Sequence, residues 1–289
     1  MKLKLEDYLD QDKLASGTLK LFSVEMDSFP DKRLRTIRVW LPDSYDEVKK
    51  FPVLYMHDGQ NLFSGLDERW KWYADKEMKK VSEKIQPIIV AVDTDLYKRA
   101  EELFPAGFPV STFFKENFGN PIPKGDLYRD FIADTLKPLI DRNFKTKPEK
   151  QFTAIGGSSM GGIESLYIHV TRPDVFGLSL CFSTATNITD DKLVLKWLNE
   201  NADRIKDDRI FFMTGGETMD YTLIRPSVEL YDTLIRSGMD YHHVALLIDS
   251  RLPHYESSWQ KYFAEAVTYL FNEDNSVVFP PENQILLKQ

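Results

Sequence analysis

The sequence predicts an α/β protein built on a mostly parallel sheet with helices on both faces. Short apolar runs alternate with segments of helical spacing along most of the chain, the pattern of strand–helix–strand crossovers. The later runs, such as residues 88–92, are almost entirely apolar, as expected for strands buried on both faces. With 289 residues, 42% of them hydrophobic, the chain can bury a large core without a metal or disulfide.

Eight runs along the chain have strand character. They are residues 19–26, 34–41, 53–57, 88–93, 151–155, 178–183, 210–214 and 244–249. The first two alternate apolar and polar side chains, which favours an antiparallel hairpin at the edge of the sheet. The other six predict the parallel part.

Six segments have the spacing of amphipathic helices. They are residues 68–84, 126–143, 160–171, 189–205, 222–237 and 255–271. Because ligands of open α/β sheets bind at the carboxyl ends of the strands, we expect the function to lie in the loops that follow the strands.

We interpret residues 18–272 as one domain, because no repeat or low-complexity tract divides the chain. Residues 1–17 are then an N-terminal extension. Residues 273–289 are a C-terminal tail, expected to be extended on the surface or partly disordered. The aromatic, proline-containing stretch 94–124 is typical of a lid or substrate wall, and a minor hydrophobic cluster is the alternative.

The charge of the chain excludes some partners. The net charge of −8 argues against nucleic acid and anionic lipid as partners. No run approaches 18 apolar residues, and the charged start differs from a signal peptide, so we expect a cytoplasmic protein without a membrane span. The single cysteine, Cys181, lies in an apolar run typical of an inert buried thiol.

A candidate nucleophile lies in the motif Gly157–Gly161, which matches G-x-S-x-G and centres on Ser159. A predicted strand ends just before the motif and a predicted helix begins just after it, the order that a nucleophile elbow requires. The alternative is a glycine-rich turn with only a structural role.

A serine nucleophile needs a base, and His254 is the best placed of the five histidines. It follows the last predicted strand, late in the chain, where this order of residues puts the base. His57 stays an alternative, because it also ends a strand. His169 lies on the helix after the motif, about 15 Å away, and His242 and His243 open a strand at the opposite end.

The acid that orients the base should follow the strand 210–214. Glu217 and Asp220 are both available there, and we favour Glu217 because it is nearer the strand end and follows two glycines. Either carboxylate could instead cap the next helix.

Two backbone N–H groups should face the oxyanion that forms during ester cleavage. Met160 follows the nucleophile and supplies one of them. Gln60 supplies the other, because Gly59 permits a tight turn after the strand 53–57.

Several motifs together resemble the putative esterase family of α/β-hydrolases, which includes esterase D, feruloyl and acetyl xylan esterases, enterochelin esterases and mycolyltransferases. They are His57–Asn61, Gly157–Gly162, Pro173–Gly177, and His254 with Trp259. The resemblance spans roughly residues 18–271. It implies an eight-stranded α/β-hydrolase sheet and no cofactor. The site residues that it implies are Ser159, Glu217 and His254, with Gln60 and Met160 at the oxyanion.

The chain departs from some branches of that family. S-formylglutathione hydrolases have a motif that resembles G-x-S-M-G-G-H around the nucleophile. This chain has Ile163 in place of the final histidine of that motif. Few residues precede the hairpin strands, whereas enterochelin esterases usually carry an extra N-terminal domain. Mycolyltransferases are secreted, and the charged start of this chain argues against secretion. The acid loop reads Thr214–Glu217 and differs from the usual G-T-x-D/E.

Four aromatic residues are candidates for substrate binding, through stacking on a sugar or phenolic ring. They are Trp70, Trp72, Phe104 and Phe108. Core packing is the alternative for these rings. Asp93 and Asp95 could hold a cation, but hydrogen bonding within the lid-like loop is favoured and no metal is expected.

The sequence therefore predicts a serine carboxylester hydrolase that acts on a small-molecule ester through an acyl-enzyme. Feruloyl and acetylated carbohydrate esters are the candidate substrates. An acyltransferase with the same residues, or a binding protein of this fold without catalysis, is the alternative. The oligomeric state is left open.

Overall fold

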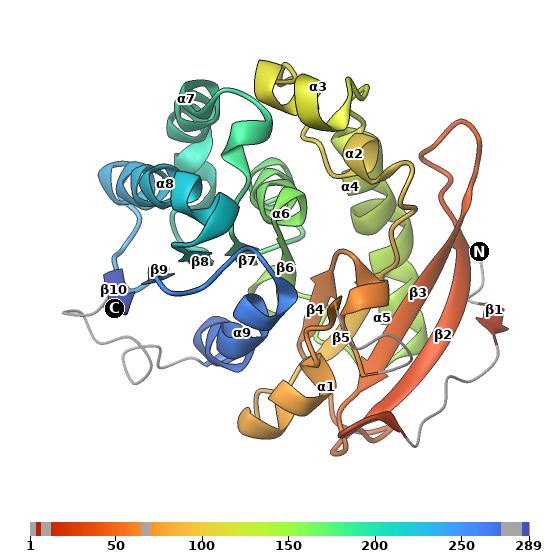
Figure 1. Ribbon diagram of the computed structural model, residues 1–289. Helices are drawn as coiled ribbons and strands as arrows, with labels where there is room; N and C mark the ends of the chain where they lie inside the picture. The colour runs from red at the N-terminus through yellow and green to blue at the C-terminus, as the bar shows by residue number, and fades with distance from the viewer. Residues whose placement is uncertain (1–3, 7–12, 65–69, 273–284, 289) are drawn as a thin grey trace.

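The computed structural model describes residues 4–6, 13–64, 70–272 and 285–288, and its centre is a ten-stranded sheet (Figure 1). The strand order is β1-β2-β3-β5-β4-β6-β7-β8-β9-β10. The strands are β1 Lys4–Glu6, β2 Thr18–Glu25, β3 Leu34–Leu41, β4 Val53–Met56, β5 Ile88–Val92, β6 Thr153–Ser158, β7 Leu178–Phe182, β8 Arg209–Gly215, β9 Val244–Asp249 and β10 Ile285–Lys288.

The eight strands β2 to β9 confirm the predicted α/β-hydrolase sheet. β2 and β3 form an antiparallel hairpin, β3 pairs antiparallel with β5, and the strands from β5 to β9 are parallel. Two short strands extend this sheet: β1 pairs antiparallel with β2, and β10 pairs parallel with β9. They come from the predicted extension and tail, of which residues 1–3, 7–12, 273–284 and 289 lie outside the described residues.

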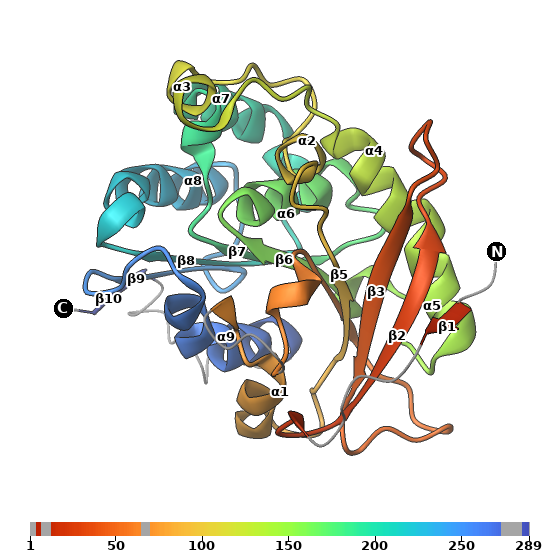
Figure 2. The same ribbon diagram turned by 45° about the vertical axis from the view of Figure 1, so that its right-hand side comes forward.

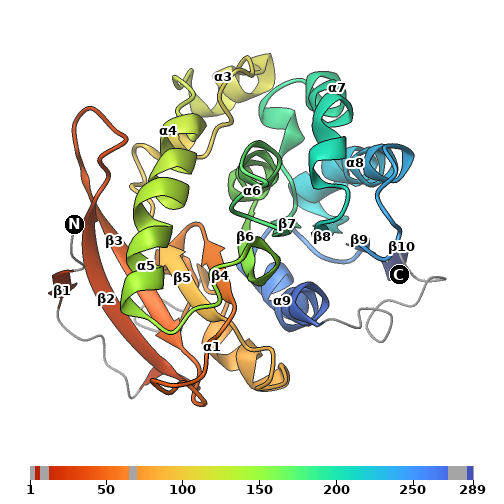
Figure 3. The ribbon, with the colours of Figure 1, turned by 180° about the vertical axis from the view of Figure 1, so that it is seen from behind.

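Helices cover both faces of the sheet (Figures 1 and 2). On one face lie α4 Gly125–Asp130, the π-helical turn η5 Phe131–Leu136, α5 Lys137–Asn143, α6 Met160–Thr171, α7 Asp191–Asn201 and α8 Ile224–Arg236. On the other face lie α1 Ala74–Glu77 and α9 Glu256–Phe271. From behind, the α4–α5 helix crosses the β3–β5 side of the sheet, while α6 lies over β6 and β7 (Figure 3).

The predicted helix at 68–84 is shorter in the structure. Residues 65–69 lie outside the described part, and the chain then forms only α1 and the 3₁₀ turn η4 Met78–Lys80. Tyr73, just before α1, has φ 48°, and Val81 after η4 is extended, so neither end continues a helix.

The sheet separates two hydrophobic cores. In β4, Val53 and Tyr55 point into a first core with α4 to α8, whereas Leu54 and Met56 point into a second core with α1 and α9. All four residues are buried, as expected for a central parallel strand. The sequence signal of an uninterrupted apolar run therefore corresponds to a strand packed on both faces.

The predicted lid-like insertion, residues 94–124, contains α2 Arg99–Glu102 and α3 Thr112–Phe118. The Ser111 side chain caps α3 by accepting the Phe114 N–H at 3.1 Å. Ser111 also donates its N–H to the Ile188 carbonyl and its hydroxyl to the Asn187 carbonyl, both at 2.9 Å. The insertion is thereby tied to the loop after β7, at the carboxyl edge of the sheet.

No helix in the described part of the chain combines the length and the apolar character that crossing a membrane requires.

Candidate active site

Ser159 lies on a sharp turn between β6 and α6. Its backbone has φ 58° and ψ −121°, a strained conformation for a residue with a side chain. Gly157 and Gly161 make the turn feasible, because a Cβ on Gly157 would lie 2.8 Å from the His57 ring and 3.1 Å from Gly161. The predicted elbow geometry is present, with the Ser159 side chain only partly covered.

His254 lies in the loop between β9 and α9 and is held by two contacts. Its Nδ1 lies 2.5 Å from Asp220 Oδ1, and its backbone N–H donates to the Thr218 hydroxyl at 2.9 Å. The carboxylate fixes the orientation of the ring and leaves Nε2 free to face a substrate.

Asp220, and not the favoured Glu217, is the carboxylate that contacts His254. The Glu217 side chain is exposed, because its N–H and that of Gly216 both donate to the Leu252 carbonyl at 3.0 Å and turn the side chain outward. β8 extends to Gly215, and the 3₁₀ turn η9 Thr218–Leu223 then returns Asp220 to the sheet edge. The sequence favoured Glu217 over the carboxylate that contacts His254, because the predicted strand ended one residue early and the turn was not foreseen.

Asp220 is completely buried in a network of donors. Its Oδ2 accepts the Gly215 N–H at 2.8 Å and the Ser183 hydroxyl at 2.7 Å. The Trp259 indole N–H donates to Ser183 Oγ at 2.8 Å. Because an indole N–H can only donate, the Ser183 proton is directed to Asp220. Sequence reasoning did not assign a role to Ser183, and Trp259 entered only as a family marker.

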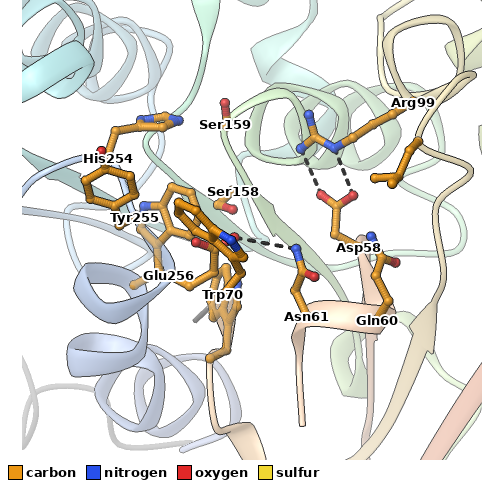
Figure 4. Close-up of a pocket in the computed structure, with 13 residues that line it drawn as sticks. Asp58, Gln60, Asn61, Trp70, Arg99, Ser158, Ser159, His254, Tyr255 and Glu256 are labelled. Carbon is orange, nitrogen blue, oxygen red and sulfur yellow. Dashed lines mark hydrogen bonds and ion pairs between the residues drawn. The ribbon is translucent and has the colours of Figure 1, made fainter. Parts of the chain in front are cut away.

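Ser159 and His254 face each other across one pocket (Figure 4). Among the contacts of the described residues, the Ser159 hydroxyl and the His254 ring do not form a hydrogen bond with each other. Such bonds are often long in unliganded enzymes and tighten when substrate binds. The two side chains approach the same space from different strands, as a nucleophile and its base must.

Two backbone N–H groups point to the same edge of the sheet. Met160 is the first residue of α6, and the first N–H groups of a helix have no partner within it. Gln60 lies in the 3₁₀ turn η2 Gly59–Asn61, which begins after Asp58 with φ 53°. Gly59 is required in that turn, since a Cβ there would lie 2.8 Å from Asp93 Oδ1.

The η2 turn is supported by the insertion. Gln60 Oε1 accepts the Thr94 N–H at 2.9 Å, and the Thr94 hydroxyl donates to Asp58 at 2.7 Å. Arg99 forms two parallel hydrogen bonds with Asp58, both 2.8 Å long. Burial raises the pKa of Asp58, but Arg99 outweighs it and lowers the pKa below its usual value. The carboxylate therefore stays charged and holds Arg99.

His57 has a structural position under the Ser159 turn. Its Nδ1 lies 3.0 Å from the Tyr128 hydroxyl, and its ring fills the space beside Gly157 and Gly161. Burial lowers the pKa of His57 to about 4, so the ring is neutral at physiological pH. The His57 ring does not form a hydrogen bond with Ser159, as it would have to if it were the base.

Ser159 lies where two pockets meet. One has a volume of about 260 Å³ and is called the polar pocket here, because its lining is the more polar of the two. It is lined by Asp58, Gln60, Asn61, Trp70, Trp72, Leu96, Arg99, Ser158, Ser159, His254, Tyr255, Glu256 and Trp259. The phenylalanine pocket has a volume of about 320 Å³. It is lined by Leu96, Arg99, Ala100, Phe113, Phe114, Phe118, Ser159, Met160, Ala185, Asn187, Ile188 and Met219.

Two of the four predicted aromatic residues line a pocket. Trp70 is half exposed, and its ring centroid lies 5.6 Å from that of Tyr255 at the polar pocket. Trp72 also borders this pocket, but it is buried and stacked on Phe182 in the second core. Trp70 therefore borders the pocket at the surface, whereas Trp72 is mainly part of the core, and a role of either ring in substrate binding stays a prediction.

Phe104 and Phe108 line neither of these two pockets, and their predicted role in substrate binding stays a prediction. Phe104 is completely buried in the first core, and Phe108 packs edge-on against Trp197. Phe113, Phe114 and Phe118 of α3 line the phenylalanine pocket instead. The insertion was expected to form a wall, but its aromatic residues could not be assigned to core or pocket without knowing where α3 begins.

The acidic candidates for a cation site have other partners. Asp93 forms two hydrogen bonds with Arg38, at 2.6 and 2.8 Å, and Asp95 accepts the Tyr97 N–H. Within the described ranges, no three histidine, cysteine or acidic side chains gather as metal ligands would.

One family model and several known proteins are similar to this chain. A family model described as "Putative esterase" matches residues 31–270. The chain is 21% identical over 258 residues to uncharacterized protein YbbA of Bacillus subtilis (strain 168), which covers 84% of this chain and 95% of YbbA. It is 30% identical over 156 residues to an endo-1,4-beta-xylanase/feruloyl esterase of Xylanibacter ruminicola. That match covers 50% of this chain and 19% of the relative.

The fold is similar to that of solved esterase structures. The structure of enterobactin and salmochelin hydrolase IroE superposes with a TM-score of 0.65 at 18% identity. The match covers 91% of this chain and 99% of the other. At this level of identity the likeness shows a common fold.

Proposed function

The chain belongs to the putative esterase family, and from this membership and the geometry of the site we propose that it is a serine carboxylester hydrolase acting through an acyl-enzyme. One observation carries the proposal. Ser159, on a strained turn, faces His254 across a pocket, and His254 is held by the buried Asp220. This is the arrangement by which a neutral hydroxyl is activated for attack on an ester carbonyl.

The proposed reaction begins when His254 takes the proton of the Ser159 hydroxyl and the oxygen attacks the ester carbonyl carbon. Asp220 accepts the hydrogen bond of the ring N–H and stabilises the imidazolium. The N–H groups of Met160 and Gln60 donate to the oxyanion. His254 then gives its proton to the leaving alcohol, and water releases the acid by the same steps.

The candidate substrates are feruloyl and acetylated carbohydrate esters. The name of the Xylanibacter ruminicola relative, endo-1,4-beta-xylanase/feruloyl esterase, supports this class. The partly exposed rings of Trp70 and Tyr255 at the polar pocket also support it, because aromatic faces stack on sugars and phenols.

The proposal is tested with a fluorophosphonate probe and p-nitrophenyl acetate. We expect stoichiometric labelling of the wild type at Ser159, and a loss of labelling in Ser159→Ala with a fall in kcat of about 10⁴-fold or more. Ser257→Ala, at an exposed serine of α9, is the matched control and should be labelled as the wild type is. Near wild-type hydrolysis by Ser159→Ala, or an unlabelled wild type, would overturn the proposal.

A further inference from the structure

We propose that the two pockets divide the substrate, so that the acyl group binds in the phenylalanine pocket and the alcohol in the polar pocket. The natural substrate is then an ester of a sizeable apolar acyl group, aliphatic or aromatic, with a hydroxyl-rich alcohol. This inference rests on the proposed function, because it takes Ser159 as the nucleophile and His254 as the group that protonates the leaving oxygen.

The orientation of the substrate between the two pockets follows from the position of His254. In an acyl transfer, the leaving alcohol oxygen must receive a proton from the base, so the alcohol lies on the side of the histidine. His254 lines the polar pocket and is not among the residues that line the phenylalanine pocket. The acyl group, bonded to the other side of the carbonyl carbon, must therefore extend past Ser159 into the phenylalanine pocket.

The phenylalanine pocket has the chemistry of an acyl site. Its walls include the three rings of Phe113, Phe114 and Phe118, together with Ile188 and Met219. The volume of about 320 Å³ lies in the range of small-molecule sites. An acetyl group would leave most of these walls without contact, whereas a longer or aromatic acyl group would cover them.

The polar pocket has the chemistry of a site for hydroxyl groups. Asn61 and Glu256 form a hydrogen bond of 3.4 Å across it, and Arg99 is held at its wall by Asp58 (Figure 4). Such side chains can donate to and accept from hydroxyl groups. The Trp70 ring, half exposed at the same pocket, offers an apolar face to a sugar ring.

The acyl assignment is tested with p-nitrophenyl acetate, butyrate and hexanoate, which share one alcohol. Because each buried methylene raises kcat/KM by up to about fourfold, we expect a hexanoate-to-acetate ratio of about tenfold or more in the wild type. Phe118→Ala opens the pocket at a residue exposed by 57%, where folding is not at risk, and should lower the ratio to about threefold or less. Tyr241→Ala removes a comparably exposed ring ahead of β9, outside both pockets, and should keep the wild-type ratio.

The alcohol assignment is tested by holding the acyl group constant, with methyl hexanoate and glucose 6-hexanoate as substrates. Trp70→Ala should lower the preference for the glucose ester by about tenfold and leave the acyl-length ratio as in the wild type. The reverse result, in which Phe118→Ala changes the alcohol preference and Trp70→Ala the acyl preference, would overturn the assignment. A wild type that hydrolyses all esters without acyl preference would also overturn it.

Failure of the proposed function gives a different result. If the proposed function is wrong, none of these esters is hydrolysed and the fluorophosphonate probe does not label Ser159. If only the division of the substrate is wrong, labelling and hydrolysis persist while the two preferences fail to follow the two pockets.

Discussion

At the scale of single residues, Asp220 is the most firmly held side chain of the site. One carboxylate oxygen contacts His254, and the other accepts hydrogen bonds from Gly215 and Ser183. Three donors on a completely buried carboxylate fix its position. Changes at Asp220 should therefore affect the rate far more than changes at the exposed Glu217.

Asp220→Ala should lower kcat/KM for p-nitrophenyl acetate by about 10³- to 10⁴-fold, because His254 loses the group that orients it. Glu217→Ala is the matched control, three residues away and exposed, and should stay within about twofold of the wild type. Steady-state kinetics of the two variants check this. A larger loss for Glu217→Ala would show that the acid is Glu217 after all.

Ser183 should act as a positioning residue for Asp220. Ser183→Ala removes one donor from the carboxylate, and we expect kcat to fall about tenfold with little change in KM. Trp259→Phe should have a similar but smaller effect, because the indole N–H acts only through the Ser183 hydroxyl.

The double variant separates this relay from general packing. If Trp259 acts through Ser183, then Trp259→Phe should change kcat little once Ser183 is already alanine. Additive losses in kcat, or a rise in KM as large as the fall in kcat, would contradict the relay.

His57 should stay neutral well below the pH at which a histidine normally titrates. Its pKa is lowered to about 4 by burial, from an unfolded value of 6.5. The neutral His57 ring therefore makes its full contribution to the free energy of unfolding above pH 6.5. Roughly 3 kcal/mol of that free energy is lost as the pH falls toward 4. An NMR titration of the imidazole nitrogens checks this, and a midpoint near 6.5 would contradict it.

The positions of Ser159 and His254 could be predicted because each depends on local order, a strand followed by a loop and a helix. The acid could not be predicted with the same precision. Its position depends on where β8 ends and on the η9 turn, and the hydrogen bonds to Leu252 that turn Glu217 outward join two distant loops.

At the scale of elements, α6 carries a buried acid that the proposed reaction does not use. Glu164 is completely buried, and neither of its carboxylate oxygens has a hydrogen-bond partner. Gly125 lies against it, since a Cβ there would be 2.5 Å from Glu164 Oε2. Burial raises the pKa of Glu164 well above its usual value, so the acid is held in its neutral form.

This burial should make stability depend on pH. Because its pKa is raised, Glu164 favours the folded state most below pH 4.5, which is the pKa of this side chain in the unfolded protein. The advantage is lost as the pH rises through the pKa of Glu164 in the folded protein. Glu164→Gln removes this loss, so the stability of the variant relative to the wild type should rise between pH 5 and pH 8. Urea unfolding at the two pH values measures it.

The control for this experiment is Glu229→Gln on α8, an ion-paired and partly exposed acid. Its stability relative to the wild type should change much less between the two pH values. A gain for Glu164→Gln that is no larger at pH 8 than at pH 5 would show that Glu164 is ionised in the folded protein.

Long elements with a clear period could be predicted almost to the residue. The helix expected at 160–171 is α6, and that expected at 255–271 is α9, one residue shorter. The short strands β1 and β10 could not be predicted, because three or four residues carry no period and form a strand only by pairing with an existing edge.

At the scale of the whole molecule, one sheet lies between two hydrophobic cores, and neighbouring residues of its strands point into different cores. Trp40, Trp72 and Trp259 belong to the second core, whereas Trp197 packs against the first and Trp70 is half exposed. Because every central strand contributes to both cores, damage to one should destabilise the other.

Leu230→Ala in α8 creates a cavity in the first core and should cost about 2 to 5 kcal/mol of stability. In a background that carries both Trp70→Phe and Trp197→Phe, the remaining tryptophans all belong to the second core, so fluorescence reports that core. We expect the urea midpoint to fall equally by fluorescence and by far-UV circular dichroism. A fluorescence midpoint that stays at the value of the background protein would show that the two faces unfold separately.

We expect the insertion to affect both the rate and the selectivity of the proposed enzyme. Thr94 and Arg99 support the turn that carries Gln60, and α3, which begins at Thr112, lines the phenylalanine pocket. A graft that exchanges this whole segment for that of a relative would therefore alter turnover along with acyl preference. Engineering a new selectivity should keep residues 94–99 and vary only the chain beyond them.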